Sequence, residues 1–142
     1  MRKVSDMLAR KGANVVTVDA ATLVLDALKL MAHRNIGSIV VTQNGAYAGI
    51  LTERDYARKV ILEGRSSDHT TVGEIMSTSL PKLLPDNTVD HCMQVMSEGK
   101  IRYLPVFNYN ELVGIISMSD VVTETILSHV DTIEQLKSYI QS

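Results

Sequence analysis

The hydrophobic and polar positions of this chain form short β-rich runs, typical of strands, and segments in which apolar residues recur at helical spacing. A short β-branched run, 15–18, precedes residues 22–34, whose apolar positions recur at helical spacing. Two β-rich runs within 36–52 then flank Asn44-Gly45, a pair typical of tight hairpin turns. A further helix is predicted from Thr52 to about Leu62. The first half of the chain is therefore predicted to be strand, helix, strand, strand, helix.

The second half repeats this order at a constant offset of 65 positions, as from Asp55 to Asp120. Gly49-Ile50-Leu51-Thr52 returns as Gly114-Ile115-Ile116-Ser117. The same pattern predicts strands over 82–84, 101–107 and 112–117, and helices over 87–98 and 117–127. A repeat of this length indicates two copies of one supersecondary unit. Because a unit of about 60 residues buries little surface alone, we expect the copies to pack around a pseudo-twofold axis.

Four segments are predicted along the chain: a first repeat over 1–63, a polar linker over 64–70, a second repeat over 71–128 and a helical tail over 129–142. The linker is the one polar, turn-rich stretch long enough to separate the halves. The tail carries an apolar stripe over 131–140 and has no counterpart in the first half. Two alternatives stay open for it, packing on its own domain or docking on a partner subunit.

Composition narrows the class of protein. Hydrophobic residues make up 45% and charged residues 21%, which is typical of a globular chain. A formal net charge of −2 without a run of like charges argues against binding to nucleic acid or an anionic membrane. No stretch approaches the roughly 18 apolar residues of a membrane span, and no apolar segment typical of a secretion signal follows the charged N-terminus. The single Cys92 is expected to be a buried thiol in a reducing cytoplasm.

Candidate chemistry lies where each hairpin passes into a helix, at Thr52 to Asp55 and Ser117 to Asp120. A hydroxyl residue followed three positions later by an acid is the ordinary N-terminal cap of a helix, worth about 1 kcal/mol. The same place has a functional interpretation, because a helix N-terminus offers unpaired N–H groups and a positive dipole end to phosphate. The carboxylate can in addition accept hydrogen bonds from both vicinal hydroxyls of a ribose. The pattern therefore favours a nucleotide over a simple anion, while capping alone stays the alternative.

The sequence contains no pattern typical of catalysis or metal binding. Its histidines form neither an HExxH motif nor a cysteine–histidine array. No nucleophile has a base at motif spacing, and there is no glycine-rich phosphate loop. We therefore expect no enzyme, no catalytic cofactor and no metal site.

The order of strand, helix, hairpin and helix, with Gly-Ile-apolar-Thr/Ser-x-x-Asp closing each hairpin, resembles a tandem pair of cystathionine beta-synthase (CBS) domains. The resemblance covers Val4 to Leu127, and the phrase Glu53 to Lys59 is similar to small stand-alone bacterial and organellar members. It implies an α/β (α+β) fold in which two β-α-β-β-α repeats pack into one compact module with two clefts. It further implies a homodimer that binds adenosine-containing ligands such as AMP, ATP, NAD(H) or S-adenosylmethionine.

Carried over by position, the resemblance implies a ligand role for each of the following residues. Asp120 and Asp55 would each hold a ribose, with Ser117 and Thr52 near the same sugar or its phosphate. The adenine side of the Asp120 cleft would be formed by Thr17, Ala21, Ile36 and Ile115, and that of the Asp55 cleft by Lys82, Ile101 and Ile50.

The two clefts are not expected to be equal. Arg102 and Tyr103 fall where the family often places basic residues that meet phosphate, whereas their first-repeat counterparts are Gly37 and Ser38. Arg54, at the start of the first-repeat helix, is a further ligand candidate, with a solvated surface arginine as its alternative. We therefore expect the Asp120 cleft to be the better nucleotide site.

These features predict a non-enzymatic sensor that binds an adenosine ligand and signals to an effector protein. A scaffold protein with vestigial clefts and an interacting tail is the alternative, and a nucleotide hydrolase has no supporting residues. The sequence leaves open which nucleotide binds, how many clefts fill and which protein responds.

Overall fold

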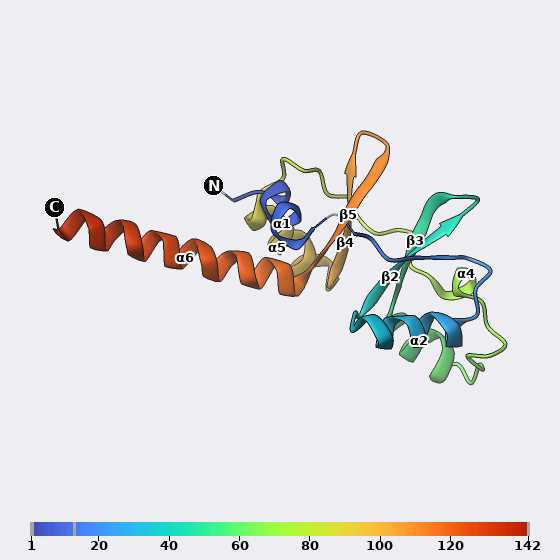
Figure 1. The fold of residues 1–142 in the computed structure, drawn as a ribbon. Coiled ribbons are helices and arrows are strands. Elements are labelled where there is room, and N and C mark those ends of the chain that lie inside the picture. The colour runs from blue at the N-terminus through green and yellow to red at the C-terminus, as the bar shows by residue number, and fades with distance from the viewer. Residues whose placement is uncertain (1, 13, 142) are drawn as a thin grey trace. The chain divides into compact units, whose positions relative to one another are not determined.

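A computed structural model describes residues 2–12 and 14–141 of the 142-residue chain. The elements are, in order, α1 (Val4–Lys11), β1 (Thr17–Asp19), α2 (Val24–Arg34), β2 (Ser38–Gln43), β3 (Ala46–Thr52), α3 (Glu53–Tyr56), the π-helical turn η1 (Ala57–Ile61), α4 (Val72–Ile75), α5 (Val89–Gly99), β4 (Tyr103–Asn108), β5 (Glu111–Ser117) and α6 (Met118–Gln141) (Figure 1).

These elements form two compact units that do not follow the linear repeats. The central unit is Val15–Leu80, and the terminal unit combines the residues up to Asn14 with those from Pro81 onward. The leading helix of each repeat is thereby exchanged: α1 belongs with the second-repeat elements, and α4 belongs with the first-repeat elements.

The central unit contains a three-stranded sheet in the order β1-β2-β3, with β1 parallel and β3 antiparallel to β2. The predicted hairpin is confirmed, since Asn44 and Gly45 both have positive φ values between β2 and β3. Gly49 has a packing reason to be glycine, because a Cβ there would lie 2.6 Å from the backbone oxygen of Ser77. The core of this unit is formed by Val24, Ala27, Met31, Ile39, Val41, Leu51, Val60, Val72 and Ile75.

The terminal unit is built on the antiparallel β4–β5 hairpin. The strand predicted over 82–84 is reduced to one parallel bridge between Leu83 and Val106. The flanking Pro81 and Pro85 explain this difference, because neither can donate a backbone hydrogen bond to a longer ladder. The core is formed by Val4, Met7, Leu83, Val89, Cys92, Met96, Leu104, Val106, Ile116 and Val121, so the prediction that Cys92 is buried is confirmed.

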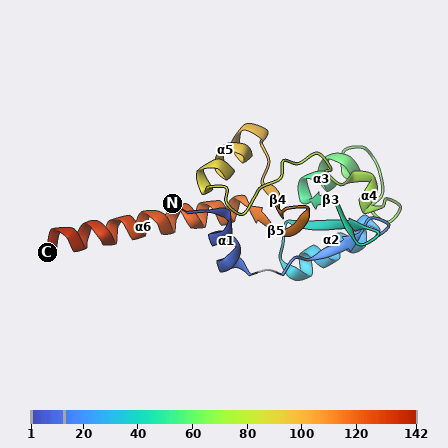
Figure 2. The same cartoon turned by 90° about the horizontal axis from the view of Figure 1, so that it is seen from above.

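The end of the chain differs from the prediction of two separate helices. Residues 118–141 form one continuous helix of 24 residues, because no glycine or proline interrupts the sequence between Leu127 and Asp131. Its first turns lie beside α1 and α5, and the rest projects beyond the other elements of the terminal unit (Figures 1 and 2). Side chains 129–138 and Ile140 are all exposed. The tail therefore buries no apolar side chain of 129–138 or Ile140 on the terminal unit, although Asp131 pairs with Arg2.

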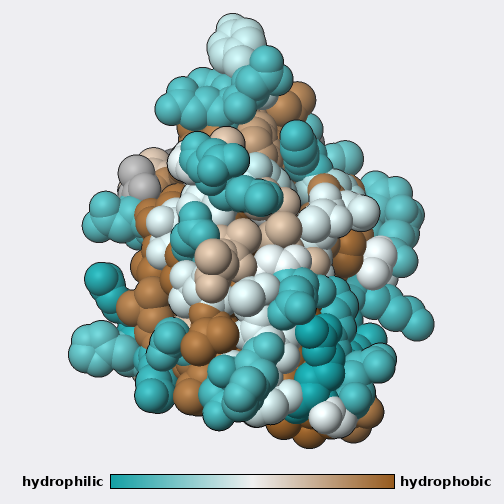
Figure 3. Space-filling model, turned by 90° about the vertical axis from the view of Figure 1, so that its right-hand side faces the viewer, coloured by the Kyte–Doolittle hydropathy of each residue, from teal (hydrophilic) through white to brown (hydrophobic). Residues whose placement is uncertain are grey.

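The face in Figure 3 carries mainly hydrophilic side chains, with smaller hydrophobic areas between them. Among the residues that the structure describes, no helix has the length and apolar character to cross a membrane.

Candidate functional site

The two repeated Thr/Ser-x-x-Asp phrases both act as helix caps. Thr52 Oγ1 accepts a hydrogen bond from the Asp55 backbone N–H at 3.1 Å, and Asp55 Oδ2 accepts one from the Thr52 N–H at 3.0 Å. In the terminal unit, Ser117 Oγ accepts from the Asp120 N–H at 3.1 Å and Asp120 Oδ2 accepts from the Ser117 N–H at 2.8 Å. The capping interpretation is thus confirmed for both phrases. A ligand role depends on what else reaches each carboxylate.

The Asp55 carboxylate is saturated by the central unit. Besides the cap, its Oδ2 accepts a hydrogen bond from Thr52 Oγ1 at 3.0 Å, and its Oδ1 contacts Ser77 Oγ at 2.9 Å and Lys59 Nζ at 3.0 Å. Only 6% of this residue is exposed. A ribose could bind here only by displacing hydrogen bonds that the protein already makes.

Asp120 is more available. Its side chain is 23% exposed, and its Oδ2 contacts Lys11 Nζ at 2.8 Å in addition to the cap. The other oxygen, Oδ1, accepts no hydrogen bond from the residues that the structure describes. Lys11 Nζ also donates to the backbone oxygen of Ile115 at 2.7 Å. The lysine therefore holds two groups to which a ligand role was assigned from the sequence.

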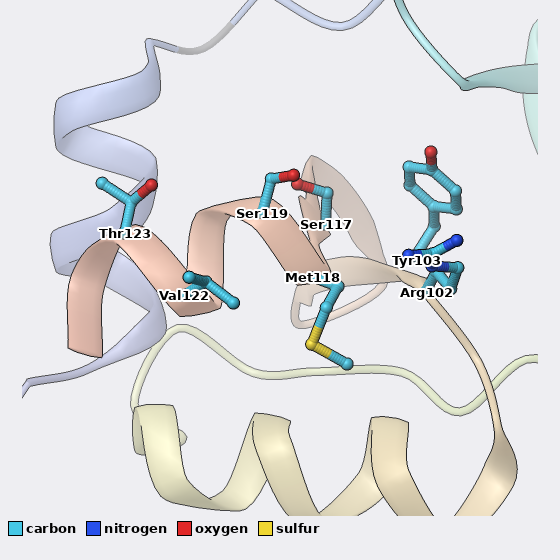
Figure 4. A pocket seen from close by; sticks show the side chains of 7 residues that line it. All are labelled: Arg102, Tyr103, Ser117, Met118, Ser119, Val122 and Thr123. Carbon is cyan, nitrogen blue, oxygen red and sulfur yellow. The ribbon is translucent and has the colours of Figure 1, made fainter. Parts of the chain in front are cut away.

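A hollow of about 470 Å³ opens beside the start of α6 (Figure 4). It is lined by Arg102, Tyr103, Ser117, Met118, Ser119, Val122 and Thr123. The side chains of Ser117 and Ser119 point to the same side of the first turn, whereas Met118 points to the other side (Figure 4). Hydroxyl groups, the guanidinium of Arg102 and the positive end of a long helix are features that favour a phosphate group.

A smaller hollow of about 90 Å³ adjoins α6 at Thr123 as well. It is lined by Met7, Arg10, Lys11, Asp120, Thr123 and Glu124. Asp120 therefore lies next to both the Lys11 contact and the helix turn that lines the larger hollow.

The remaining predicted residues are distributed over both units. Thr17 lies on β1, Ala21 in the turn after it and Ile36 after α2, all within the central unit, whereas Asp120 and Ile115 belong to the terminal unit. Ile50 on β3 and Arg54 on α3 accompany Asp55 in the central unit, whereas Lys82 and Ile101 belong to the terminal unit. The assembly of these residues into two clefts stays a prediction.

Lys82 and Ile101 also have structural roles. The Lys82 Nζ lies 4.4 Å from the centre of the Phe107 ring, a cation–π contact. The Ile101 N–H donates to the Met96 backbone oxygen at 3.0 Å and helps to end α5.

A buried carboxylate, which the sequence analysis missed, connects α1 to α6. Glu124 is completely buried; its Oε1 contacts Arg2 Nη1 at 2.9 Å, and its Oε2 pairs with Arg10. Arg2 also pairs with Asp131. At the offset of 65 positions, Glu124 corresponds to Lys59 in the first repeat. This reversal of charge between the two copies was a sequence signal that could have pointed to Glu124.

Metal ligands do not gather anywhere in the described part of the chain, where no three His, Cys, Asp or Glu residues are placed to share an ion. Burial raises the pKa of the Cys92 thiol to about 11, which leaves this cysteine largely protonated and poorly nucleophilic. The described residues therefore offer neither a cluster of metal ligands nor a reactive thiol.

Comparison with known proteins identifies the family to which nearly the whole chain is similar. The CBS domain family matches residues 4–62 and again 72–126. The mitochondrial CBS domain-containing protein CBSX3 of Arabidopsis thaliana is 38% identical over 97% of this chain and 71% of its own length. The structure of a protein with CBS domains from Burkholderia ambifaria is 41% identical, with a TM-score of 0.84 over 88% of this chain and 94% of that one.

A hexameric CBS-CP12 protein from bloom-forming cyanobacteria is also similar, at 30% identity and a TM-score of 0.75 over 86% of this chain and 70% of that one. The tandem pattern read from the sequence and the two matched segments agree. The chain belongs to the CBS domain family and carries two CBS domains in tandem.

Proposed function

We propose that this protein is a regulatory module that binds an adenosine-containing ligand at the start of α6 and passes its occupancy to a partner protein. The observation that carries the proposal is the position of Asp120, whose partly exposed carboxylate lines the smaller hollow. That hollow shares Thr123 with the larger one, which is lined by Arg102, Ser117 and Ser119. The ligands AMP, ATP, NAD(H) and S-adenosylmethionine share the ribose and adenine that such a site would recognise.

The proposed contacts follow from charge and hydrogen-bonding capacity. A carboxylate accepts hydrogen bonds from both ribose hydroxyls, and these bonds are charge-assisted. A phosphate would lie toward Arg102 and the N-terminus of α6, where the helix dipole favours an anion. Asp55 is proposed as a weaker site, since four protein contacts already satisfy its carboxylate.

Signalling requires that the ligand prefer one conformation of the protein over another, because a ligand that binds two states equally shifts neither. The chain is proposed to act through such a preference and without catalysis. The free, buried Cys92 is compatible with a reducing compartment, for which we propose the cytoplasm.

Calorimetric titration with AMP, ATP, NADH and S-adenosylmethionine tests the proposal on the wild type and on Asp120→Asn. The amide keeps an oxygen for the cap and removes the charge, so at least one of the four ligands should bind the wild type and bind the variant about ten- to a hundredfold more weakly. Asp90→Asn, on the exposed face of α5, is the control and should bind like the wild type. The sensor proposal fails if the wild type binds none of the four ligands.

A second candidate function, self-association, is favoured by the exposed stripe on α6. The stripe comprises Val122, Ile126, Val130, Ile133, Leu136 and Ile140. Ile126, Ile133 and Ile140 recur every seven residues. The second apolar position of the heptad is occupied by Val122 and Leu136, with His129 between them.

We propose that a second copy of this chain covers the stripe and forms a homodimer. Six partly exposed apolar side chains offer roughly 600 Å² per copy, comparable with about 800 Å² per partner in a standard interface. Asp120, Glu124 and Asp131 lie on the opposite face of the helix, toward α1, so two stripes would meet without repulsion between these acids. The similar CBS-CP12 protein is itself an oligomer.

Sedimentation of the full chain tests this second candidate. The wild type should sediment as a dimer at micromolar concentration, and the double variant Ile133→Asp/Leu136→Asp as a monomer with unchanged nucleotide binding. Gln135→Asp, which adds a charge outside the stripe, is the control. A monomeric wild type would refute the self-association proposal, and loss of nucleotide binding without loss of the dimer would contradict the assignment of the stripe.

A further inference from the structure

The Lys11 side chain has a counterpart in the central unit that is built differently. In that unit, Ser77 Oγ donates to Asp55 Oδ1 at 2.9 Å and the Ser77 N–H donates to the Ile50 oxygen at 2.9 Å. In the terminal unit, Lys11 Nζ contacts the two repeat-equivalent residues, Asp120 at Oδ2 at 2.8 Å and the Ile115 backbone oxygen at 2.7 Å. A single ammonium group therefore replaces a hydroxyl and a backbone N–H.

The two arrangements differ in how easily they can be released. Ser77 is fixed, because its backbone oxygen also accepts from the Ile50 N–H at 3.0 Å, closing a two-bond bridge. Lys11 reaches its partners through a flexible side chain that is 36% exposed, from the last residue of α1. An ammonium group is strongly hydrated in water, and ion pairs with this exposure contribute little to stability. Moving one side chain would free Asp120 and the Ile115 oxygen together.

We infer that Lys11 is an exchangeable cation that sets the selectivity of the Asp120 site between neutral and phosphate-bearing ligands. The inference rests on the proposed function. Without a ligand, Lys11 neutralises the Asp120 carboxylate; when a ribose takes over that carboxylate, the ammonium is released next to the bound ligand.

The released charge has opposite effects on two kinds of ligand. A neutral nucleoside whose two hydroxyls bind both oxygens of Asp120 displaces Lys11 from Oδ2 and gains no charge interaction in return, so Lys11 competes with it. A nucleotide brings negative phosphate toward the negative Asp120, and a nearby ammonium offsets that repulsion. Lys11 therefore favours nucleotides over nucleosides.

Titration of the full chain with adenosine and with ATP tests this inference. Lys11→Met keeps the length of the side chain and removes its charge. It should bind adenosine about two- to fivefold more tightly and ATP about two- to fivefold more weakly than the wild type, so that the ratio of ATP to adenosine affinity falls about tenfold. Lys11→Arg should keep the wild-type ratio, and Lys29→Met, on the exposed side of α2, is the charge-matched control.

The outcomes separate this inference from the proposed function. If the wild type binds ATP and Asp120→Asn weakens that binding, but Lys11→Met leaves the ATP to adenosine ratio unchanged, the role of Lys11 is overturned and the proposed function stands. Weaker adenosine binding by Lys11→Met would also overturn it, because removal of a side chain that competes with adenosine should strengthen adenosine binding. If neither ATP nor adenosine binds the wild type, the role of Lys11 is overturned, and the titration with the four ligands decides separately whether the proposed function stands.

Discussion

The buried carboxylate of Glu124 gives the sharpest stability prediction. Glu124 has no exposed surface, whereas the side chains of its partners Arg2 and Arg10 are 30% and 43% exposed. The cost of breaking the network should therefore depend on which charge is left behind. A buried carboxylate that loses its cation cannot form hydrogen bonds to water instead, whereas a partly exposed arginine that loses its carboxylate can.

Two variants make the comparison. Glu124→Gln keeps the shape of the side chain and removes its negative charge, so two charge-assisted hydrogen bonds are lost. Each such bond contributes about 1.5–3 kcal/mol when buried. The net loss is smaller here because the partly exposed arginines regain hydrogen bonds to water. We expect a loss of about 2 kcal/mol in the free energy of unfolding. The double variant Arg2→Met/Arg10→Met leaves the buried carboxylate unpaired and should cost about 3–5 kcal/mol.

Urea unfolding followed by circular dichroism measures both values, with the slope of the transition checked for each variant. Arg65→Met is the control, because its partner Glu74 lies 3.2 Å away in an exposed pair, and its effect should stay within about 0.5 kcal/mol. The reasoning is refuted if Glu124→Gln costs more than the double arginine variant, since that order would mean that the arginines, and not the carboxylate, carry the desolvation penalty.

Three further predictions concern the glycines, the cap and the cysteine. Gly49→Ala should lower the free energy of unfolding by about 1–3 kcal/mol in chemical denaturation, because its Cβ would meet a backbone oxygen. Gly114→Ala should lower it less, because its Cβ would meet the movable end of the Leu8 side chain. Equal losses in the two variants would contradict this reasoning. Ser117→Ala should lower stability by about 1 kcal/mol through loss of the α6 cap, measured as a thermal shift against Ser128→Ala, and no shift would contradict the capping role. Cys92 should react slowly with a thiol reagent at pH 8 and fast in urea, since its pKa in the folded protein is about 11. The thiol ionises at a lower pH in the unfolded chain than in the folded protein, so the free energy of unfolding should fall as the pH rises above about 9. Rapid modification of the folded protein by the reagent would refute the burial of Cys92.

Local signals in the sequence were sufficient for much of the fold. The Asn44-Gly45 turn and the β-rich strands beside it depend on neighbouring residues alone, and both were predicted correctly. The duplication was visible for the same reason, because each copy repeats its own local pattern. Where the repeat was used to set boundaries, it misled: α6 continues past Leu127, since no residue there disfavours a helix.

The least predictable part of the site was the set of cations around α6. Arg2, Arg10 and Lys11 are close to the chain start, and their partners follow more than a hundred positions later. No periodicity or spacing rule connects such distant residues; the contacts exist because α1 packs in the terminal unit. The Asp120 and Ser117 pair, in contrast, is local, so its cap geometry could be predicted, while the ligand role assigned by resemblance stays a prediction.

The exchange of leading helices constrains the order in which the protein can be completed during synthesis. The central unit, Val15–Leu80, leaves the ribosome as one continuous stretch and can fold while the remaining chain is still being made. The helix α1 emerges before it, yet the buried Glu124 that pairs with Arg10 of α1 is translated 114 positions later than Arg10. Arg10 therefore lacks its buried partner until α6 has been made. A nascent chain arrested before α6 should hold a protease-resistant centre and an accessible N-terminus.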